Sequence, residues 1–244
     1  HETEGKTGIL INGKDDDAKV TRHVLEHMAP GRNFDVSVEC GLPTKQGFGM
    51  SASGAVAAAL CISEIVGGSR KEAFEAAHTA DAVCGGGLGD VSGLMHEWDV
   101  PIRTEAGLPP FGCAKDHKIE FERLTLIVIG GDMSTAGILA DSGKLESICK
   151  AGEEAMRRFE GSPGKDQLFD ISNKFSSEAC LRGKEVAGAM QELENNGMRA
   201  SMCMLGNSIF TDASEKEVRD AVGDAYWIFS TASTAEPARI IRKA

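Results

Sequence analysis

The order of apolar and polar residues along the chain predicts short strands and longer helices. Strands are predicted at residues 8–12, 34–40, 100–104, 119–129, 199–211, 225–229 and 238–242. Helices are predicted at residues 15–29, 55–66, 70–83 and 214–223, and across most of 135–195 with a break at 161–164. Because strands and helices do not alternate strictly, this order favours an α+β architecture over a doubly wound sheet.

The net charge of the chain limits the classes of partner that we expect it to bind. There are 26 Lys and Arg residues against 37 Asp and Glu residues, which gives a formal net charge of -11. Nucleic acids and anionic membranes attract basic surfaces, so this charge argues against both as partners. Hydrophobic residues make up 41% of the chain, which is typical of a folded protein with one large or two modest domains.

The seven cysteines are spread singly along the chain, and no CxxC pair occurs. This spacing argues against a zinc ribbon and against a thioredoxin-like redox site. The longest uncharged stretch, residues 46–63, is too polar to span a membrane, and residues 1–14 do not read as a signal peptide. We therefore expect a cytoplasmic protein with reduced thiols.

A loop rich in glycine and serine, residues 47–54, leads directly into the predicted helix at 55–66. Gly47 and Gly49 permit positive φ angles and leave room for a ligand beside the backbone. Ser51 stands near the helix start, where free N–H groups and the helix dipole favour an anion. The spacing matches neither a P-loop nor a GxGxxG motif. Two interpretations remain open at this point, a phosphate-binding loop and a glycine-rich turn that Ser51 caps.

The stretch Pro-x-x-x-Gly-Phe-Gly-Met-Ser-Ala-Ser, residues 43–53, resembles the phosphate loop of the galactokinase, homoserine, mevalonate and phosphomevalonate kinases, the GHMP kinases. Met50 stands where that superfamily usually has a serine. Residues 78–91 and 201–210 resemble two further motifs of its archaeal pantoate kinase branch, in the expected order. The resemblance implies that the phosphates of ATP bind along Pro43, Gly47, Phe48, Gly49, Met50, Ser51, Ala52 and Ser53.

The resemblance also implies which residues serve catalysis and metal binding. Asp90, in a glycine-flanked turn, matches the catalytic aspartate, which would accept the proton of the substrate hydroxyl or orient it. Ser51 and Asp81 match the ligands of Mg2+, and the related kinases generally have Glu where this chain has Asp81. Judged as residues alone, Asp90 would be a turn residue and Asp81 a solvated charge on a helix.

Three further residues have implied roles in binding. His78 lies one helical turn before Asp81 and matches a residue that contacts the substrate. Arg103 would bind the carboxylate of pantoate through two parallel hydrogen bonds. Gly206, in the third motif, would allow a close approach of the backbone near the phosphate site. Without the resemblance, His78 would be a packed or surface histidine, Arg103 a surface charge and Gly206 part of a turn between strands.

The implied fold is the two-lobed α+β fold of GHMP kinases, with an N-terminal lobe at residues 1–105 and a C-terminal lobe at 106–244. The family's first motif, a Pro-Gly stretch, is not found in this sequence, so an incomplete N-terminal lobe is expected. The implied activity is the phosphorylation of (R)-pantoate to 4-phosphopantoate by ATP and Mg2+, in coenzyme A biosynthesis, by a homodimer. Alternatives are a GHMP kinase of the mevalonate or homoserine type, a non-catalytic ligand-sensing relative, and an α+β domain without a nucleotide site.

Overall fold

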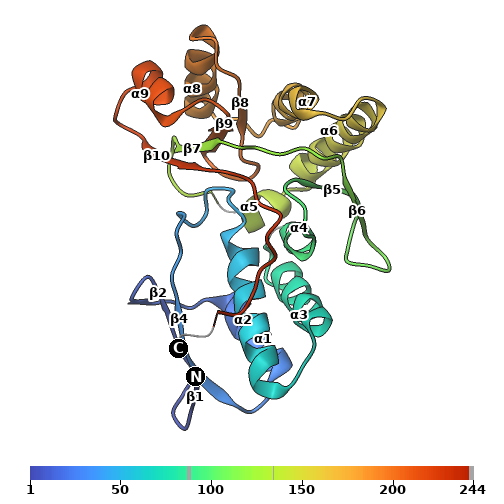
Figure 1. The fold of residues 1–244 in the computed structure, drawn as a ribbon, viewed down its shortest axis with the longest axis vertical. Coiled ribbons are helices and arrows are strands. Elements are labelled where there is room, and N and C mark those ends of the chain that lie inside the picture. The colour runs from blue at the N-terminus through green and yellow to red at the C-terminus, as the bar shows by residue number, and fades with distance from the viewer. Residues whose placement is uncertain (87–88, 134, 242–244) are drawn as a thin grey trace.

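The computed structural model describes residues 1–86, 89–133 and 135–241, and its two lobes stack along the longest axis (Figure 1). The lower lobe in that view contains β1 (Glu2–Thr3), β2 (Gly8–Ile11), β3 (Lys14–Asp15), α1 (Lys19–Met28), β4 (Asn33–Val38), α2 (Met50–Val66), α3 (Arg70–Val83) and α4 (Asp90–Met95). Its strands form one sheet in the order β1-β4-β2-β3, in which β2 and β4 are parallel. Helices α1 and α2 pack on this sheet through buried Ile9, Leu25, Phe34 and Ile62.

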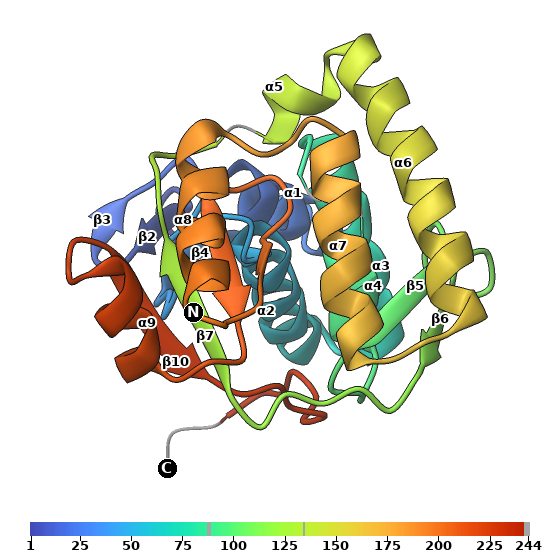
Figure 2. The same cartoon turned by 90° about the horizontal axis from the view of Figure 1, so that it is seen from above.

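The upper lobe contains β7 (Leu124–Val128), α5 (Thr135–Leu139), α6 (Ser142–Gly161), α7 (Lys165–Glu178), α8 (Lys184–Asn195), β8 (Ala200–Met202), β9 (Ser208–Thr211), α9 (Glu215–Val222) and β10 (Trp227–Thr231). Its strands form an antiparallel sheet in the order β10-β7-β9-β8. Seen from above, α8 and α9 lie over this sheet, and α6 and α7 lie to one side (Figure 2). Buried Ile127, Leu193, Ile209 and Val218 join the sheet to α8 and α9.

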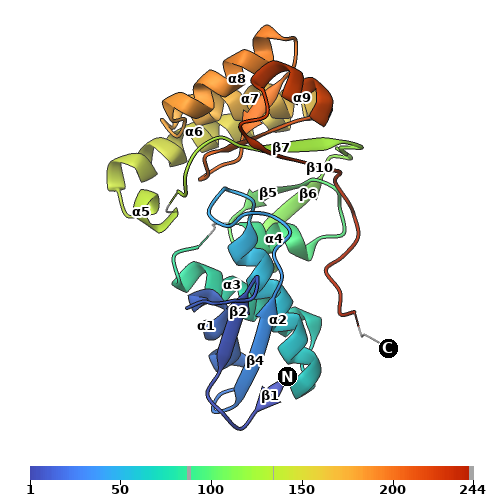
Figure 3. The same ribbon diagram turned by 90° about the vertical axis from the view of Figure 1, so that its left-hand side faces the viewer.

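A hairpin of β5 (Pro101–Glu105) and β6 (Cys113–Asp116) lies between the lobes (Figure 3). The predicted lobe boundary at residues 105 and 106 falls inside this hairpin and stays a prediction. The α+β class is confirmed, because helices and mixed sheets occur without strict alternation. Within the described residues, no helix has the length and apolar character needed to cross a membrane.

Local sequence signals explain where several elements begin. Ser69 and Glu72 form a capping box at the start of α3, whose bounds match the prediction. The predicted helix at 15–29 begins only at Lys19, because residues 14–15 pair with β2. Helix α2 begins at Met50 rather than at residue 55, because Gly49 takes the left-handed N-cap conformation with φ 65° and lets the following residues turn into the helix.

The predicted strands differ from the observed ones in several places, and the short strands β1 and β3 were not predicted. Residues 119–123 lie outside β7, because Phe121 exchanges hydrogen bonds with Ser233 instead of with a sheet neighbour. The single strand predicted at 199–211 is the hairpin of β8 and β9, whose turn packs against the loop that precedes α2. Residues 238–241 form no strand, and residue 242 lies outside the described part. Strand β6 was not predicted.

The segment after β10 runs from the upper lobe down along the lower lobe (Figure 3). Ser233 N donates to Phe121 O at 2.9 Å, and Phe121 N donates to Ser233 Oγ at 2.8 Å. Further along, Arg70 at the start of α3 donates to Ala238 O at 2.6 Å. The C-terminal segment is therefore bonded to both lobes.

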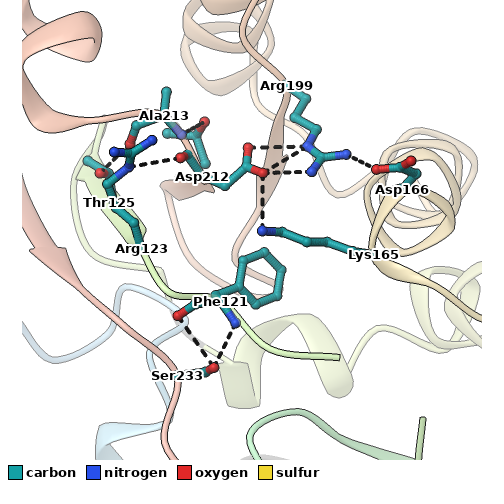
Figure 4. Close-up of polar contacts among 10 residues, drawn as sticks. Phe121, Arg123, Thr125, Lys165, Asp166, Arg199, Asp212, Ala213 and Ser233 are labelled. Atoms are coloured by element: carbon teal, nitrogen blue, oxygen red, sulfur yellow. Dashed lines mark hydrogen bonds and ion pairs between the residues drawn. The ribbon is translucent and has the colours of Figure 1, made fainter. Parts of the chain in front are cut away.

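An ionic cluster ties α7 to the strands of the upper lobe (Figure 4). The Asp212 carboxylate accepts from Arg199 at 2.6 Å and pairs with Lys165 at 3.4 Å, and Arg199 also pairs with Asp166. Hydrogen bonding to Arg199 lowers the pKa of Asp212. Because Lys165 and Asp166 begin α7 while Arg199 and Asp212 flank β8 and β9, the cluster fixes one end of α7 to the sheet.

Candidate active site

A cavity of about 1170 Å³ opens between the two lobes. The lower lobe contributes the start of α1, the loop before α2 and residues near the start of α4. The upper lobe contributes the loop after β7, facing residues of α6 and α7, and the turn between β8 and β9. Arg103 of β5 also lines it. A cavity that lies between lobes and combines apolar walls with a few charged groups is a typical ligand site.

The loop at residues 45–51 forms one wall of this cavity, and glycine is required at two of its positions. Gly47 has φ 76° and Gly49 has φ 65°, both in the left-handed region. A Cβ added at Gly47 would also lie 2.7 Å from Met204 O. No described side chain caps α2, so its first-turn N–H groups are available to an anion in the cavity.

Ser51 links this loop to the neighbouring helix. Its hydroxyl donates to Asp81 Oδ1 at 3.1 Å, and Asp81, on the last turn of α3, is only 2% exposed. Gly86 lies against the same carboxylate: its N–H donates to Asp81 O at 2.8 Å, and an added Cβ would lie 2.0 Å from Asp81 Oδ1. Glycine at position 86 therefore allows the chain to fold back closely over Asp81.

Asp90 faces the same loop from the start of α4. A Cβ added at Gly49 would lie 3.5 Å from Asp90 Cγ, so this carboxyl group packs directly beside the loop backbone. Burial raises the pKa of Asp90, and the positive charge of Arg103 opposes that rise. Arg103 passes over Gly89, where an added Cβ would lie 2.7 Å from Arg103 Nε. Asp90 and Arg103 therefore share one end of the cavity.

The structure brings many of the predicted site residues together at the cavity. The lining includes Gly47, Phe48, Gly49, Met50, Ser51, Asp90 and Arg103. Asp81 lies behind this lining and reaches it through Ser51. For these residues the observed positions are compatible with the implied roles, which stay predictions.

The other predicted residues lie outside the described lining of the cavity, namely Pro43, Ala52, Ser53, His78 and Gly206. Ala52 is 1% exposed and belongs to the core between α2 and α3. His78 is half-buried on α3. Gly206 packs on the backbone of Gln46.

Several cavity residues were not found from the sequence. Lys45 lies in the same loop and pairs with Asp132 of the upper lobe at 3.3 Å. The sequence did contain a signal for this residue, because a cation inside a candidate phosphate loop is suited to bind phosphate. Lys19, at the start of α1, also lines the cavity. The apolar lining from α6 and α7 includes Gly152. It could not be predicted from the sequence, because those helices carry no motif and reach the site only through tertiary packing.

The oxygen atoms of Ser51 and Asp81 are suited to a hard divalent cation. Mg2+ prefers oxygen ligands and is usually bound through one or two carboxylates together with substrate phosphates and water. Among the described residues, no group of three or more His, Cys, Asp or Glu side chains could hold a metal by itself. The site therefore fits a cation that arrives with phosphates better than a cation caged by protein alone.

Comparison with known proteins relates the chain to one group of enzymes. The family model for the GHMP kinases N terminal domain matches residues 18–97. The sequence is 29% identical to the pantoate kinase of Thermococcus kodakarensis, over 87% of this chain and 72% of that protein. It is 26% identical to the pantoate kinase of Methanocaldococcus jannaschii, over 90% of this chain and 80% of that protein.

Solved structures give the same relationship. A phosphotransferase related to the CoA biosynthesis pathway aligns with a TM-score of 0.83 and 25% identity, over 97% of this chain and 83% of that one. A homoserine kinase from Cytophaga hutchinsonii aligns with a TM-score of 0.60 and 14% identity, over 96% of this chain and 84% of that one. The second likeness is one of fold alone, and both alignments extend across the two lobes.

Proposed function

We propose that this chain, a kinase with the fold and the phosphate loop of the GHMP superfamily, transfers the γ-phosphoryl group of ATP to a hydroxyl group of pantoate. The products are ADP and 4-phosphopantoate. The single observation that carries the proposal is the position of Asp90, whose carboxyl group packs against Gly49 of the phosphate loop and shares the cavity with Arg103. A proton acceptor, a phosphate-binding backbone and a carboxylate-binding cation thus face one space.

The loop at residues 45–51 would bind the phosphates of ATP. Its support is the uncapped N-terminus of α2, the open backbone at Gly47 and Gly49, and the cationic Lys45 at the cavity wall. Helix N-termini favour anions through both free N–H groups and the helix dipole. In phosphoryl transfer the protein acts mainly by positioning and by electrostatic stabilisation, so a rigid array of N–H groups is the expected machinery.

Ser51 and Asp81 would hold Mg2+ next to these phosphates. When bound, the ion would neutralise the charge that develops on the phosphate oxygens during transfer. The support is chemical, because both side chains offer oxygen atoms and lie 3.1 Å apart. Gly86 would keep the Asp81 carboxylate in this position, since its N–H and its bare Cα border Asp81.

Asp90 would act as the base for the attacking hydroxyl. The oxygen of that hydroxyl forms a bond to the γ-phosphorus, the bond from this phosphorus to the β–γ bridging oxygen breaks, and the proton passes to the Asp90 carboxylate. A raised pKa makes this carboxylate a better proton acceptor than an ordinary aspartate. Removal of water around it, the cause of that rise, also strengthens its attraction for a donated hydroxyl proton.

Pantoate suits the remaining part of the cavity. Its carboxylate would pair with the Arg103 guanidinium, whose planar fork matches a carboxylate through two hydrogen bonds. Its dimethyl-substituted carbon requires apolar walls, and Ile102, Met156 and Phe159 supply such walls in the same cavity. His78 lies on α3 outside the described lining, and its proposed contact with the substrate rests on the motif resemblance alone.

The proposal is tested with the purified protein, Mg-ATP and a panel of three acceptors, namely pantoate, mevalonate and homoserine. ADP release is followed for each, and the phosphorylated product is identified by phosphorus NMR. We expect pantoate to exceed the others by at least about tenfold in kcat/KM, because only it combines a carboxylate with the dimethyl group and lacks an ammonium group. A preference for mevalonate or homoserine would contradict the assignment of pantoate as the substrate. Binding of Mg-ADP without turnover of any acceptor would indicate a ligand-sensing protein.

A further inference from the structure

The phosphate loop belongs to the lower lobe in sequence, but the upper lobe holds its first part. Lys45 O accepts from Met133 N at 3.1 Å, and Lys45 Nζ pairs with Asp132 at 3.3 Å. At the next residue, Gln46 Nε2 donates to Gly130 O at 3.2 Å. Three residues of the segment after β7, two through their backbone and Asp132 through its carboxylate, therefore contact the loop before it enters the cavity wall.

Gln46 and its partner Ser208 are both buried at this contact. Gln46 is 4% exposed, and its own carbonyl oxygen accepts from Ser208 Oγ at 2.5 Å. Ser208 opens β9 and is 0% exposed. Within the described residues the side-chain amide of Gln46 is bonded through Nε2 only, because its buried Oε1 has no hydrogen-bond partner. The bonds of Nε2 to Gly130 O and of the Gln46 carbonyl oxygen to Ser208 Oγ are therefore the polar contacts that hold this residue.

Two glycines bring the backbones of the two lobes into direct contact at the same point. A Cβ added at Gly206 would lie 2.1 Å from both Gln46 C and Gln46 O. A Cβ added at Gly47 would lie 2.7 Å from Met204 O and 2.8 Å from Cys203 O. The turn between β8 and β9 therefore sits on residues 46 and 47 with no space for a side chain between them.

The backbone conformation of the loop depends in part on its contacts with the upper lobe. Lys45, Gly47 and Gly49 have φ values of 59°, 76° and 65°, so left-handed residues alternate along the segment that leads to Ser51. Glycine adopts such φ values readily, whereas the left-handed conformation of Lys45 persists only where the surrounding structure imposes it. The contacts at Gln46 supply that constraint one residue before the first glycine of the cavity wall.

We infer that Gln46 and Ser208 are positioning residues that set the phosphate loop in register with Asp90. They touch neither the nucleotide nor the acceptor: Gln46 and Ser208 lie outside the described lining of the cavity, while Gly47 and Gly49 lie within it. The hydrogen bond between them joins the two lobes, so it fixes the N–H groups at the start of α2 relative to the upper lobe. This inference rests on the proposed function only in that the loop binds phosphates. It also gives Gly206 a different role, contact with the loop instead of contact with phosphate.

Two variants on opposite lobes test the inference, Ser208→Ala and Gln46→Met, and the second keeps the length of the side chain. The matched control is Ser201→Ala. Ser201 is also 0% exposed and lies on neighbouring β8, but its hydroxyl bonds to Phe169 O and Asn173 Oδ1, away from the loop. Folding of all three is followed by thermal melting, so a variant that fails to fold leaves the other to decide the outcome.

The deciding readouts are the Kd of Mg-ADP from calorimetry and the separate KM values for ATP and pantoate. We expect Ser208→Ala and Gln46→Met each to raise the Kd of Mg-ADP and the KM for ATP by about tenfold, while the KM for pantoate changes by less than about twofold. The control should lower the melting temperature by a similar amount and leave the Kd of Mg-ADP unchanged. A Kd within about twofold of wild type in both loop variants, or an equal loss in the control, would overturn the inference.

The two proposals fail in different ways. A wild-type protein that binds Mg-ADP but does not phosphorylate pantoate would refute the substrate, and the inference on Gln46 and Ser208 would still be decided by the Kd of Mg-ADP. A wild-type protein that binds no Mg-ADP would overturn both.

Discussion

Ser51 Oγ donates a hydrogen bond of 3.1 Å to Oδ1 of Asp81, and this bond joins the first turn of α2 to the last turn of α3. The two residues are distant in sequence, and one of them is almost fully buried while the other faces the cavity. A carboxylate behind a hydroxyl at the start of a helix is a suitable arrangement for a cation that travels with a nucleotide.

Ser51→Ala and Asp81→Asn are each expected to raise the Mg2+ concentration for half-maximal activity by about tenfold or more, because each removes or neutralises one oxygen ligand. The measurement is a Mg2+ titration at saturating ATP and pantoate. The double variant should lose less than the product of the two single losses, because the residues act as one unit. Unchanged Mg2+ dependence in Asp81→Asn would remove Asp81 from the metal site.

Gly86→Ala is expected to displace the Asp81 carboxylate, because the new Cβ would lie 2.0 Å from Asp81 Oδ1 and 2.9 Å from Asp81 O. Overpacking of this kind costs roughly 1–3 kcal/mol of unfolding free energy, and activity should fall by more than stability alone explains. Gly188→Ala is the matched control, because Gly188 is exposed on α8 and an added Cβ meets nothing within 4 Å. That control should gain up to about 1 kcal/mol and keep full activity. Equal behaviour of the two variants would contradict the role given to Gly86.

Arg103→Lys is expected to raise the KM for pantoate by about 10-fold to 100-fold, because a lysine cannot reproduce the two-pronged contact of a guanidinium with a carboxylate. The KM for ATP should stay within about twofold, since the phosphate loop is not altered. Steady-state kinetics with each substrate varied in turn separates these effects. An increase confined to the KM for ATP would place Arg103 at the nucleotide instead.

Asp90→Asn is expected to increase stability at neutral pH while it abolishes catalysis. Burial raises the pKa of Asp90 above its ordinary value of 3.8 and outweighs the attraction of Arg103. Between the ordinary and the raised value, the folded protein holds a proton that the unfolded chain has released, so the stability contributed by Asp90 falls as pH rises through this window. The variant should therefore melt at a higher temperature than the wild type at neutral pH, and the difference should vanish below the ordinary pKa. A lower melting temperature of the variant at neutral pH would contradict the desolvation of this carboxylate.

Part of this molecule was predictable because its signals are local. Helix α3 was predicted with its observed bounds, and local signals mark both of its ends, the capping box of Ser69 and Glu72 at the start and Gly85 just after the C-cap. The glycine-rich loop before α2 was singled out by its glycines and its motif resemblance, and its phosphate-binding role stays a prediction. The two-lobed GHMP fold followed from the same resemblance. The contact of Ser51 with Asp81 was anticipated only as a shared metal site.

The rest depended on contacts between distant segments. Phe121 bonds to Ser233, so residues 119–123 leave the sheet although their alternation is typical of a strand. The turn at Gly206 was expected to approach the phosphate site closely, and this role stays a prediction. That it packs on Gln46 could not be predicted, because no local pattern reveals which backbone a glycine will approach. The apolar cavity wall from α6 and α7 has the same origin, since any amphipathic helix could have supplied it.

The most direct test of the central claim is the pantoate-dependent release of ADP by wild-type protein and by Asp90→Asn, measured at saturating Mg-ATP together with the Kd of Mg-ADP. We expect turnover by the wild type and a kcat at least about 100-fold lower in the variant, because loss of a general base typically has that effect. The Kd of Mg-ADP should be the same in both proteins. A variant with kcat within about threefold of wild type would show that Asp90 is not the base, and the assignment of the catalytic site would be wrong.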